Sequence, residues 1–329
     1  MSTPGQPEVL LESEAIAATV PGSTGKDIAA RSPGQLFWRR FRQDRLAMVA
    51  LAAVIAIVLI AIFAPLIVKI VGTPDPKLTN ADATTDFGQP LGPSGAHPFG
   101  VDKLGRDVFS RVVYGSRISL EVAFIATALT MLIGVTLGLI AGYRRGWVDS
   151  LLARGMDIVL AFPVLVLAIG IGVACSGQNG CAGGTIQPGL NVVIVVIVIA
   201  SWPYVARLVR GQVLSLREKE FVESARSLGA SDMRIVFREV LPNLIAPLIV
   251  YATILIPQNI LFEAALSFLG IGVDPEQASW GAMISDATSI FRQAWWFMTF
   301  PGLALLLTVL AFNILGDGLQ DALNPRNTR

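Results

Sequence analysis

The sequence predicts an all-α polytopic membrane protein with six transmembrane helices and both termini in the cytoplasm. Apolar residues make up 53% of the 329 residues, only 15% are charged, and the mean hydropathy is +0.63. The apolar residues occur in blocks of the roughly 20 residues that a helix needs to cross a bilayer. The six predicted spans are Leu46–Val71, Ile118–Tyr143, Leu151–Ala174, Gly189–Val213, Leu244–Leu266 and Trp296–Leu319.

The distribution of Lys and Arg indicates how these spans are oriented. If the N-terminus is cytoplasmic, the inner segments hold most of the 25 basic residues, as the positive-inside rule requires. One outer loop departs from the rule, because it carries Lys103, Arg106, Arg111 and Arg117. The net charge of +1 argues against nucleic acid as a partner, since its binders need a concentrated basic face.

Three regions follow one another along the chain. Residues 1–35 are rich in Gly, Pro, Ser, Thr and Ala, so we expect a disordered cytoplasmic tail and not a cleaved signal peptide. Residues 36–117 are expected to hold the first transmembrane helix and an outer loop. Residues 118–329 form the predicted core of five transmembrane helices, with a charged loop at 217–242.

The outer loop of the 36–117 region contains an amphipathic segment. Its apolar residues share one helical face and its charged residues lie on the others, which predicts a short interfacial helix on the outer membrane surface. The apolar residues are Leu104, Val108, Phe109, Val112 and Val113.

Small, polar and helix-breaking residues occur inside the spans. Gly134, Gly138 and Gly142 form a stripe that lets another helix backbone approach closely in lipid. Glu263 is expected near the outer face, where it either points into a pathway through the membrane or makes a structural hydrogen bond. Asp317, near the predicted cytoplasmic end of span six, is expected to brace that span against Arg residues of the charged cytoplasmic loop or against Arg326. Five prolines predict kinks in spans three to six: Pro163, Pro203, Pro247, Pro257 and Pro301.

The chain has only two cysteines, Cys175 and Cys181, in one loop that this topology places outside. An oxidising exterior allows a disulfide between them, and two free thiols in a flexible loop fit the sequence equally well. The sequence leaves both alternatives open.

Two short motifs resemble catalytic or nucleotide-binding sequences and fail on their context. GSTGKD (residues 22–27) has Asp27 where a phosphate-binding loop needs Ser or Thr, and it follows no strand. In GPSGAH, Ser94 and His97 lie in a Pro/Gly-rich loop, which is typical of a turn and not of a Ser–His pair. No Cys/His cluster has metal-ligand spacing. We therefore expect a chain that is not an enzyme and holds no catalytic residue, cofactor or metal.

The densest run of charges, EFVESARSLGASDMRIVFREVLPNL (residues 220–244), lies between spans four and five on the predicted cytoplasmic side. Its first part places Phe221, Val222, Ala225 and Leu228 on one helical face. A glycine follows as a helix stop, and a second amphipathic helix then runs to Pro242, which is expected to end it. The loop is thus predicted to be a helix–turn–helix suited to docking on a soluble partner.

This loop resembles the EAA loop of ABC importer permeases. The matching residues are Glu223, Ser224, Ala225, Gly229, Ala230, Leu241 and Pro242. In that family the loop forms the coupling helix that fits into a cleft on the ATPase subunit. Two residues depart from the family pattern, since Ser224 replaces a usual Ala and Glu239 occupies an often apolar position.

Further segments resemble the dipeptide/oligopeptide/nickel branch of these permeases, and within it the C-type subunit. They are HPFGVDKLGRDVFSRVVYGSRISL (97–120), EAALSFLGIGVDPEQASWGAMI (263–284), FNILGDGLQDALNPR (312–326) and the region around FWRRFRQDRLAMVAL. The resemblance implies the type I importer fold in a bacterial cytoplasmic membrane and binding-protein-dependent import. It also implies a heterodimer with a homologous B-type permease, two cytoplasmic ATPase subunits that carry ATP and magnesium, and an extracytoplasmic substrate-binding protein.

The resemblance makes di- or oligopeptides the expected cargo, with nickel chelates or other small solutes as the alternative. An ion-coupled secondary transporter or a channel is the alternative from a different class, and it would need no ATPase. That alternative predicts several ionisable residues in mid-membrane or inverted repeats with broken helices, and the sequence shows neither clearly.

Overall fold

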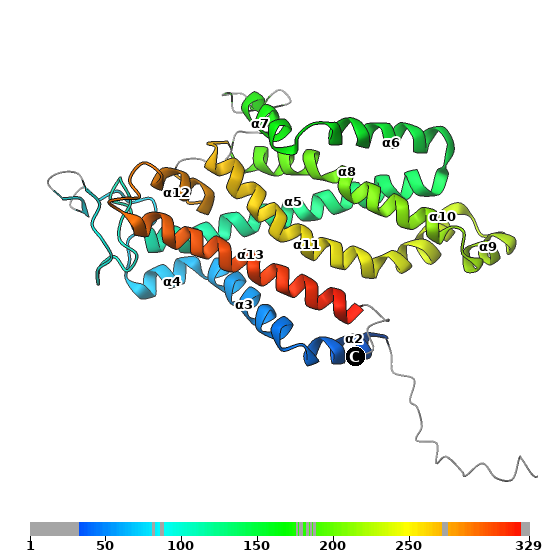
Figure 1. Ribbon diagram of the computed structural model, residues 1–329, viewed down its shortest axis with the longest axis horizontal. Helices are drawn as coiled ribbons and strands as arrows, with labels where there is room; N and C mark the ends of the chain where they lie inside the picture. The colour runs from blue at the N-terminus through cyan, green and yellow to red at the C-terminus, as the bar shows by residue number, and fades with distance from the viewer. Residues whose placement is uncertain are drawn as a thin grey trace, which may run out of the picture. The chain divides into compact units, whose positions relative to one another are not determined.

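A computed structural model shows a chain built almost entirely of helices (Figure 1). The structure describes residues 33–80, 83–85, 89–175, 177, 180–181, 184, 186, 189–271 and 276–323. Most of the predicted tail, the GSTGKD motif and Arg326 lie outside the described residues. The chain divides into two compact units, Met1–Arg40 and Phe41–Arg329. Helix α2 (Pro33–Gln43) includes the boundary, and the remaining described helices belong to the second unit.

The described helices confirm the all-α membrane fold. Five helical segments are long and apolar enough to cross a membrane: α3 (Arg45–Ile62), α5 (Val108–Arg144), α8 (Leu190–Leu216), the continuous run Asp232–Phe268 and α13 (Trp295–Leu323). A bent pair, α6 (Gly146–Ala161) and α7 (Val164–Cys175), supplies a sixth if it is counted as one span. Two short helices, α4 (Ala64–Val71) and α12 (Trp280–Ala287), complete one end of this unit.

The first predicted span is not one helix. Asp44 caps the N-terminus of α3, accepting hydrogen bonds from two backbone N–H groups at 2.9 and 3.1 Å. The helix ends at Ile62, and α4 starts after Phe63 with a proline in its first turn. Because proline fits the first turn of a helix and disrupts an interior, the break falls where Pro65 would otherwise interrupt the ladder. The predicted span Leu46–Val71 thus consists of two helices, and α3 alone has the length and composition to cross a membrane.

The third predicted span contains a sharp bend. Helices α6 and α7 meet at 87° around Phe162 and Pro163. Proline lacks an N–H group and pushes the preceding residue out of the helical region, and Phe162 has an extended conformation. The predicted kink at Pro163 is confirmed, and its angle is so large that α6 and α7 are two separate helices. The other four prolines lie inside continuous helices.

The predicted interfacial helix is instead the beginning of α5. Asp107 caps this helix by accepting a hydrogen bond from the Ser110 N–H at 2.7 Å, so the span starts well before Ile118. Val108 and Val113 are buried against other helices, whereas Leu104 lies in the preceding loop and is half-exposed. An apolar helical face indicates that the face is buried, but not what buries it. Here other helices of the protein bury it, and not the membrane surface.

The glycine stripe of α5 faces α8, against which α5 packs most extensively. A Cβ atom added at Gly134 would lie 2.5 Å from Val205 Cβ, and one added at Gly138 would lie 2.6 Å from the backbone oxygen of Ala206. Gly142 has the same relation to Val213. No larger side chain fits without moving backbone, so the stripe sets the distance between the two helices.

Figure 1 shows helices α9 and α10 at one end of this unit, called the loop end here, and α4 and α12 at the opposite end. At the opposite end, Ser94 and His97 form the expected turn, with the Ser94 N–H donating to the His97 carbonyl at 2.8 Å. The His97 ring lies 2.8 Å from Asp107 and not against Ser94 as a catalytic pair would require. A disulfide joins Cys175 to Cys181 across the short loop after α7.

Candidate functional site

The charged loop between α8 and α11 folds as two short helices around a glycine. Helix α9 (Glu220–Ser227) is followed closely by Gly229, whose φ of +78° is a left-handed conformation that glycine adopts without strain. The N–H groups of Gly229 and Ala230 donate back to the carbonyls of Arg226 and Ala225 at 2.9 and 3.1 Å. These bonds satisfy carbonyls that the end of α9 would otherwise leave unpaired.

The second part of the loop runs directly into the membrane helix. Helix α10 (Asp232–Ile235), the π-helical segment η3 (Val236–Val240) and α11 (Leu241–Phe268) follow without interruption. The prediction that Pro242 ends a helix was therefore wrong. Proline removes one N–H bond and crowds the carbonyl four residues earlier, and the wider π turn, in which the Leu241 N–H donates to the Val236 carbonyl, accommodates both effects.

The loop has a buried base and an exposed apolar tip. Val222, Ile235 and Val240 are fully buried in a cluster with residues of α5, α8 and α11. Leu228 is 88% exposed, and the exposed fractions of Met233 and Phe237 are 66% and 54%. The predicted single apolar face of α9 is thus divided, because Val222 points inward while Leu228 points out.

The residues that match the EAA motif lie along this boundary. Glu223, Ser224 and Gly229 are exposed, and so is Pro242 at the start of α11. Ala225, Ala230 and Leu241 are half-buried and pack against the cluster at the base. The motif therefore combines small residues next to the base with polar residues at the surface.

Tyr143, near the end of α5, contacts the beginning and the middle of loop 217–242. Its hydroxyl donates to Asp232 Oδ1 at 2.9 Å, and its carbonyl accepts from Arg217 Nη1 at 2.6 Å. The Arg217 guanidinium also lies over the Tyr143 ring, 5.7 Å from its centroid, in cation–π geometry. Burial lowers the pKa of the Arg217 guanidinium, and the nearby cations Arg145 and Arg226 lower it further.

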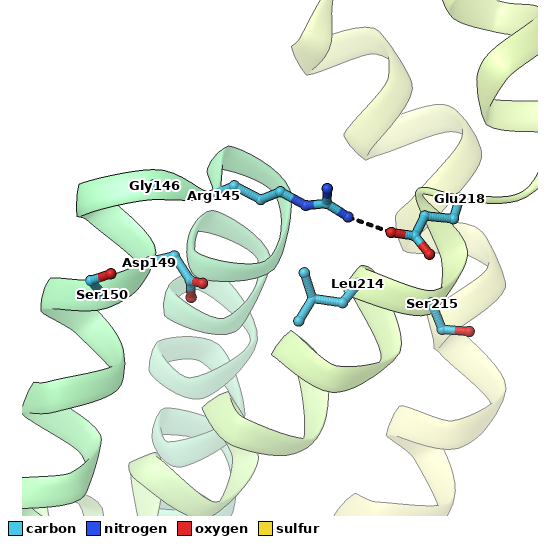
Figure 2. Close-up of a pocket in the computed structure, with 7 residues that line it drawn as sticks. All are labelled: Arg145, Gly146, Asp149, Ser150, Leu214, Ser215 and Glu218. Atoms are coloured by element: carbon cyan, nitrogen blue, oxygen red, sulfur yellow. Dashed lines mark hydrogen bonds and ion pairs between the residues drawn. The ribbon is translucent and has the colours of Figure 1, made fainter.

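An open pocket of about 720 Å³ lies between the α5–α6 turn and the end of α8 (Figure 2). Figure 2 shows Arg145 reaching across the pocket to form an ion pair with Glu218. Deeper in the same region, Arg210 donates two hydrogen bonds to the Asp149 carboxylate at 2.5 and 2.8 Å. The Arg145–Glu218 pair is largely exposed and contributes little, whereas the bidentate and less exposed pair is the stronger link between α6 and α8.

The two acidic residues singled out in the spans have different surroundings. Glu263 is fully buried and accepts hydrogen bonds from Ser119 Oγ at 2.9 Å and Ser267 Oγ at 2.7 Å. Of the two expected roles, these contacts match the structural hydrogen bond and not a position in a pathway. Asp317 is exposed and makes no ion pair with any described residue. Helix α13 continues to Leu323, so Asp317 is not in its last turn, and the described residues show no brace.

The sequence did not point to the residues that hold the loop in place. Tyr143 and Asp232 are 89 positions apart, and neither belongs to a motif. An aromatic residue at the end of a predicted span was the only available signal, and such residues are common at membrane surfaces for reasons unrelated to a loop.

Several apolar helices of membrane-spanning length, joined by an exposed helical loop, define a polytopic membrane protein. Residues 134–329 match the family model described as "Binding-protein-dependent transport system inner membrane component", and residues 32–90 match "N-terminal TM domain of oligopeptide transport permease C". The chain belongs to this family and to its dipeptide/oligopeptide branch of ABC importer permeases, as the motifs predicted. It is a multi-pass protein of the bacterial inner membrane and a transport component without an enzymatic role of its own.

Relatives of known type extend over nearly the whole chain. It is 42% identical to the dipeptide transport system permease protein DppC of Alkalihalophilus pseudofirmus, over 90% of this chain and 91% of the relative. It is 41% identical to the glutathione transport system permease protein GsiD of Pectobacterium atrosepticum, over 95% and 97%. The corresponding protein of Escherichia coli O157:H7 is 44% identical over 90% and 91%.

Solved structures confirm the permease fold. An inward-facing MetNI methionine ABC transporter aligns with a TM-score of 0.54 at 22% identity, covering 66% of this chain and 97% of that chain. An amino acid ABC transporter with histidines aligns with a TM-score of 0.50 at 17% identity, covering 64% and 94%. At these identities the likeness concerns the fold alone.

Proposed function

We propose that this chain forms half of the pathway of an ATP-driven importer of di- or oligopeptides, and that loop 217–242 couples it to ATPase subunits. The observation that carries the proposal is the exposed apolar tip of the loop, Leu228, Met233 and Phe237, on a buried base. Large exposed apolar side chains on a loop that joins two apolar helices indicate a protein interface. The names of the dipeptide and glutathione relatives support a peptide cargo.

The base of the loop makes it suited to transmit force. Val222 and Ile235 are packed among α5, α8 and α11, and Tyr143 bonds to Asp232. A partner that moves the tip would therefore move the membrane helices with it, because a close-packed cluster shifts as a body. A homologous B-type permease, two ATPase subunits and a binding protein complete the proposed transporter. A channel or ion-coupled transporter would have no use for such a tip.

Substituting the tip tests the coupling. In Leu228→Glu, a charge replaces an apolar contact, and we expect co-purification of ATPase subunits and peptide uptake to fall at least about tenfold, as for an interface hot spot. Membrane abundance should stay normal, because Leu228 is 88% exposed and supports no packing. Leu104→Glu, at a half-exposed loop position at the opposite end, is the matched control and should change neither readout. Retention of ATPase subunits by Leu228→Glu would contradict the proposal.

A further inference from the structure

A second pocket, of about 360 Å³, lies between α7, α8 and α11. Its polar lining comes from two of the membrane helices, with Ser201 and Tyr204 on α8 and Tyr251, Gln258 and Asn259 on α11. All five lie within segments that are long and apolar enough to span a bilayer. Polar side chains at that depth need a partner or water, because lipid offers neither.

Four of these side chains have no hydrogen-bond partner in the part of the chain that the structure describes. They are Ser201, Tyr204, Tyr251 and Gln258. Tyr204 is 50% exposed, and Gln258 is exposed as well. Asn259 differs, since it is buried and donates to Thr127 Oγ1 of α5 at 2.8 Å, which fixes the wall behind the pocket.

The pocket-lining residues of α11 form a continuous stripe along one face of the helix. Tyr251 and Gln258 are seven residues apart, nearly two turns, so they share a face and lie about 10 Å apart along the helix. Leu255 and Phe262 occupy the same face and also line the pocket. An extended chain of two or three residues covers roughly 7–11 Å, so a small peptide matches the length of the stripe.

The lining contains amides and hydroxyls and no Asp, Glu, Lys or Arg. Tyrosine, serine and glutamine side chains donate and accept hydrogen bonds without a fixed charge. A peptide presents N–H and C=O groups at every residue, whatever its side chains are. Neutral donors and acceptors therefore fit the backbone of a peptide and do not discriminate by the charge of its side chains.

We propose that this pocket is the wall that the chain contributes to the translocation pathway, and that it binds the backbone amides of a peptide in transit. The inference rests on the proposed function and names the residues that serve it. Tyr204, Tyr251 and Gln258 contact the peptide, and Asn259 positions α11 against α5. Tight coverage of the same face by the partner permease is the outcome that would exclude this role.

Thiol labelling tests whether the wall meets water. The two natural cysteines form a disulfide, so the unsubstituted chain offers no competing thiol. Tyr204→Cys and Gln258→Cys are treated with a charged, water-soluble thiol reagent in the whole membrane-embedded transporter during ATP turnover. Ile249→Cys is the matched control, because Ile249 is 45% exposed and lies two residues before Tyr251, about 200° round the same helix.

We expect modification of both pathway positions at least about tenfold faster than at the control, because only a thiol in water ionises and reacts. Addition of a transported peptide should slow it. If neither Tyr204→Cys nor Gln258→Cys reacts faster than Ile249→Cys while both variants import peptide, the face is covered and the inference is wrong.

A second substitution tests the proposed hydrogen bond between Gln258 and the peptide. Gln258→Leu keeps the approximate size and removes the amide, and peptide uptake at limiting concentration should fall about three- to tenfold, the effect of losing a hydrogen bond. Ile249→Leu should import normally. Labelling in the absence of added peptide reports only access to water, so rapid labelling in a transporter that imports no peptide would reject the peptide cargo and leave the assignment of this face to the pathway standing. Normal uptake by Gln258→Leu would reject peptide contact at this residue.

Discussion

Gly229 ends α9 in the left-handed region of backbone conformation, at a φ of +78°. A Cβ atom added there would meet no other atom within 4 Å, so space does not restrict this position. Only the backbone angle does, because a side chain in the left-handed region crowds its own carbonyl. The turn that directs Leu228 outward and returns the chain to α10 therefore depends on one torsion angle.

Gly229→Val separates this strain from any loss of contacts. We expect peptide uptake to fall several-fold at normal membrane abundance, since a β-branched residue in this conformation costs roughly 1–2 kcal/mol. Gly229→Asn is the matched control, because asparagine enters the left-handed region more readily and should retain most of the uptake. Uptake by Gly229→Val equal to that of the unsubstituted chain would show that the angle is unimportant.

At the scale of helices, periodicity predicted which segments are helical, and it did not predict what covers them. The apolar face that includes Val108 and Val113 was recognised and assigned to the membrane surface, whereas other helices bury it. Pro163 predicted a kink, but no local sequence pattern predicts its 87° angle. The contact of Tyr143 with Asp232 joins positions 89 apart, so spacing could not reveal it.

The glycine stripe between α5 and α8 gives a direct test of helix packing. In Gly138→Ala the new methyl group would lie 2.6 Å from the backbone oxygen of Ala206, so the helices must separate. We expect a loss of roughly 1–3 kcal/mol of stability, as for overpacked cores, and a lower thermal midpoint of the purified transporter. Gly211→Ala is the control on α8, where an added Cβ meets nothing within 4 Å. Equal midpoints for the two variants would contradict this packing.

The Tyr143 hydroxyl links the end of α5 to the loop, and Tyr143→Phe removes the hydroxyl while keeping the ring. The ring stays beneath Arg217, while the 2.9 Å hydrogen bond to Asp232 is lost at a cost of about 0.5–1.5 kcal/mol. We expect several-fold weaker stimulation of ATP hydrolysis by substrate, with ATPase subunits still bound because the tip is unchanged. Asp317→Asn, which removes no ion pair among the described residues, should leave the stimulation intact. An unchanged response in Tyr143→Phe would remove Tyr143 from the coupling route.

At the scale of the whole second unit, the two ends have different kinds of polar structure. The loop end carries cations and an exposed apolar tip suited to a soluble partner. The opposite end holds the basic residues that depart from the positive-inside rule, and three of the four, Lys103, Arg106 and Arg111, have partners within the fold. Arg106 Nε donates to Asp102 at 2.6 Å, and Lys103 donates to Asp286 at 2.7 Å. Their presence in that loop therefore has a structural reason and does not require a reversed orientation.

The expected orientation, with the loop end in the cytoplasm, predicts which thiols are reachable from outside the cell. Leu104→Cys and Leu228→Cys occupy exposed positions at opposite ends, and the unsubstituted chain has no free thiol to add background. A membrane-impermeant maleimide should label Leu104→Cys in intact spheroplasts and Leu228→Cys only after permeabilisation. The reason is that most of the 25 basic residues then lie inside, as insertion favours. The unsubstituted chain, tested alongside, should stay unlabelled. Labelling of Leu228→Cys in sealed spheroplasts would reverse the orientation and place the proposed coupling loop on the side of the membrane that has no ATP.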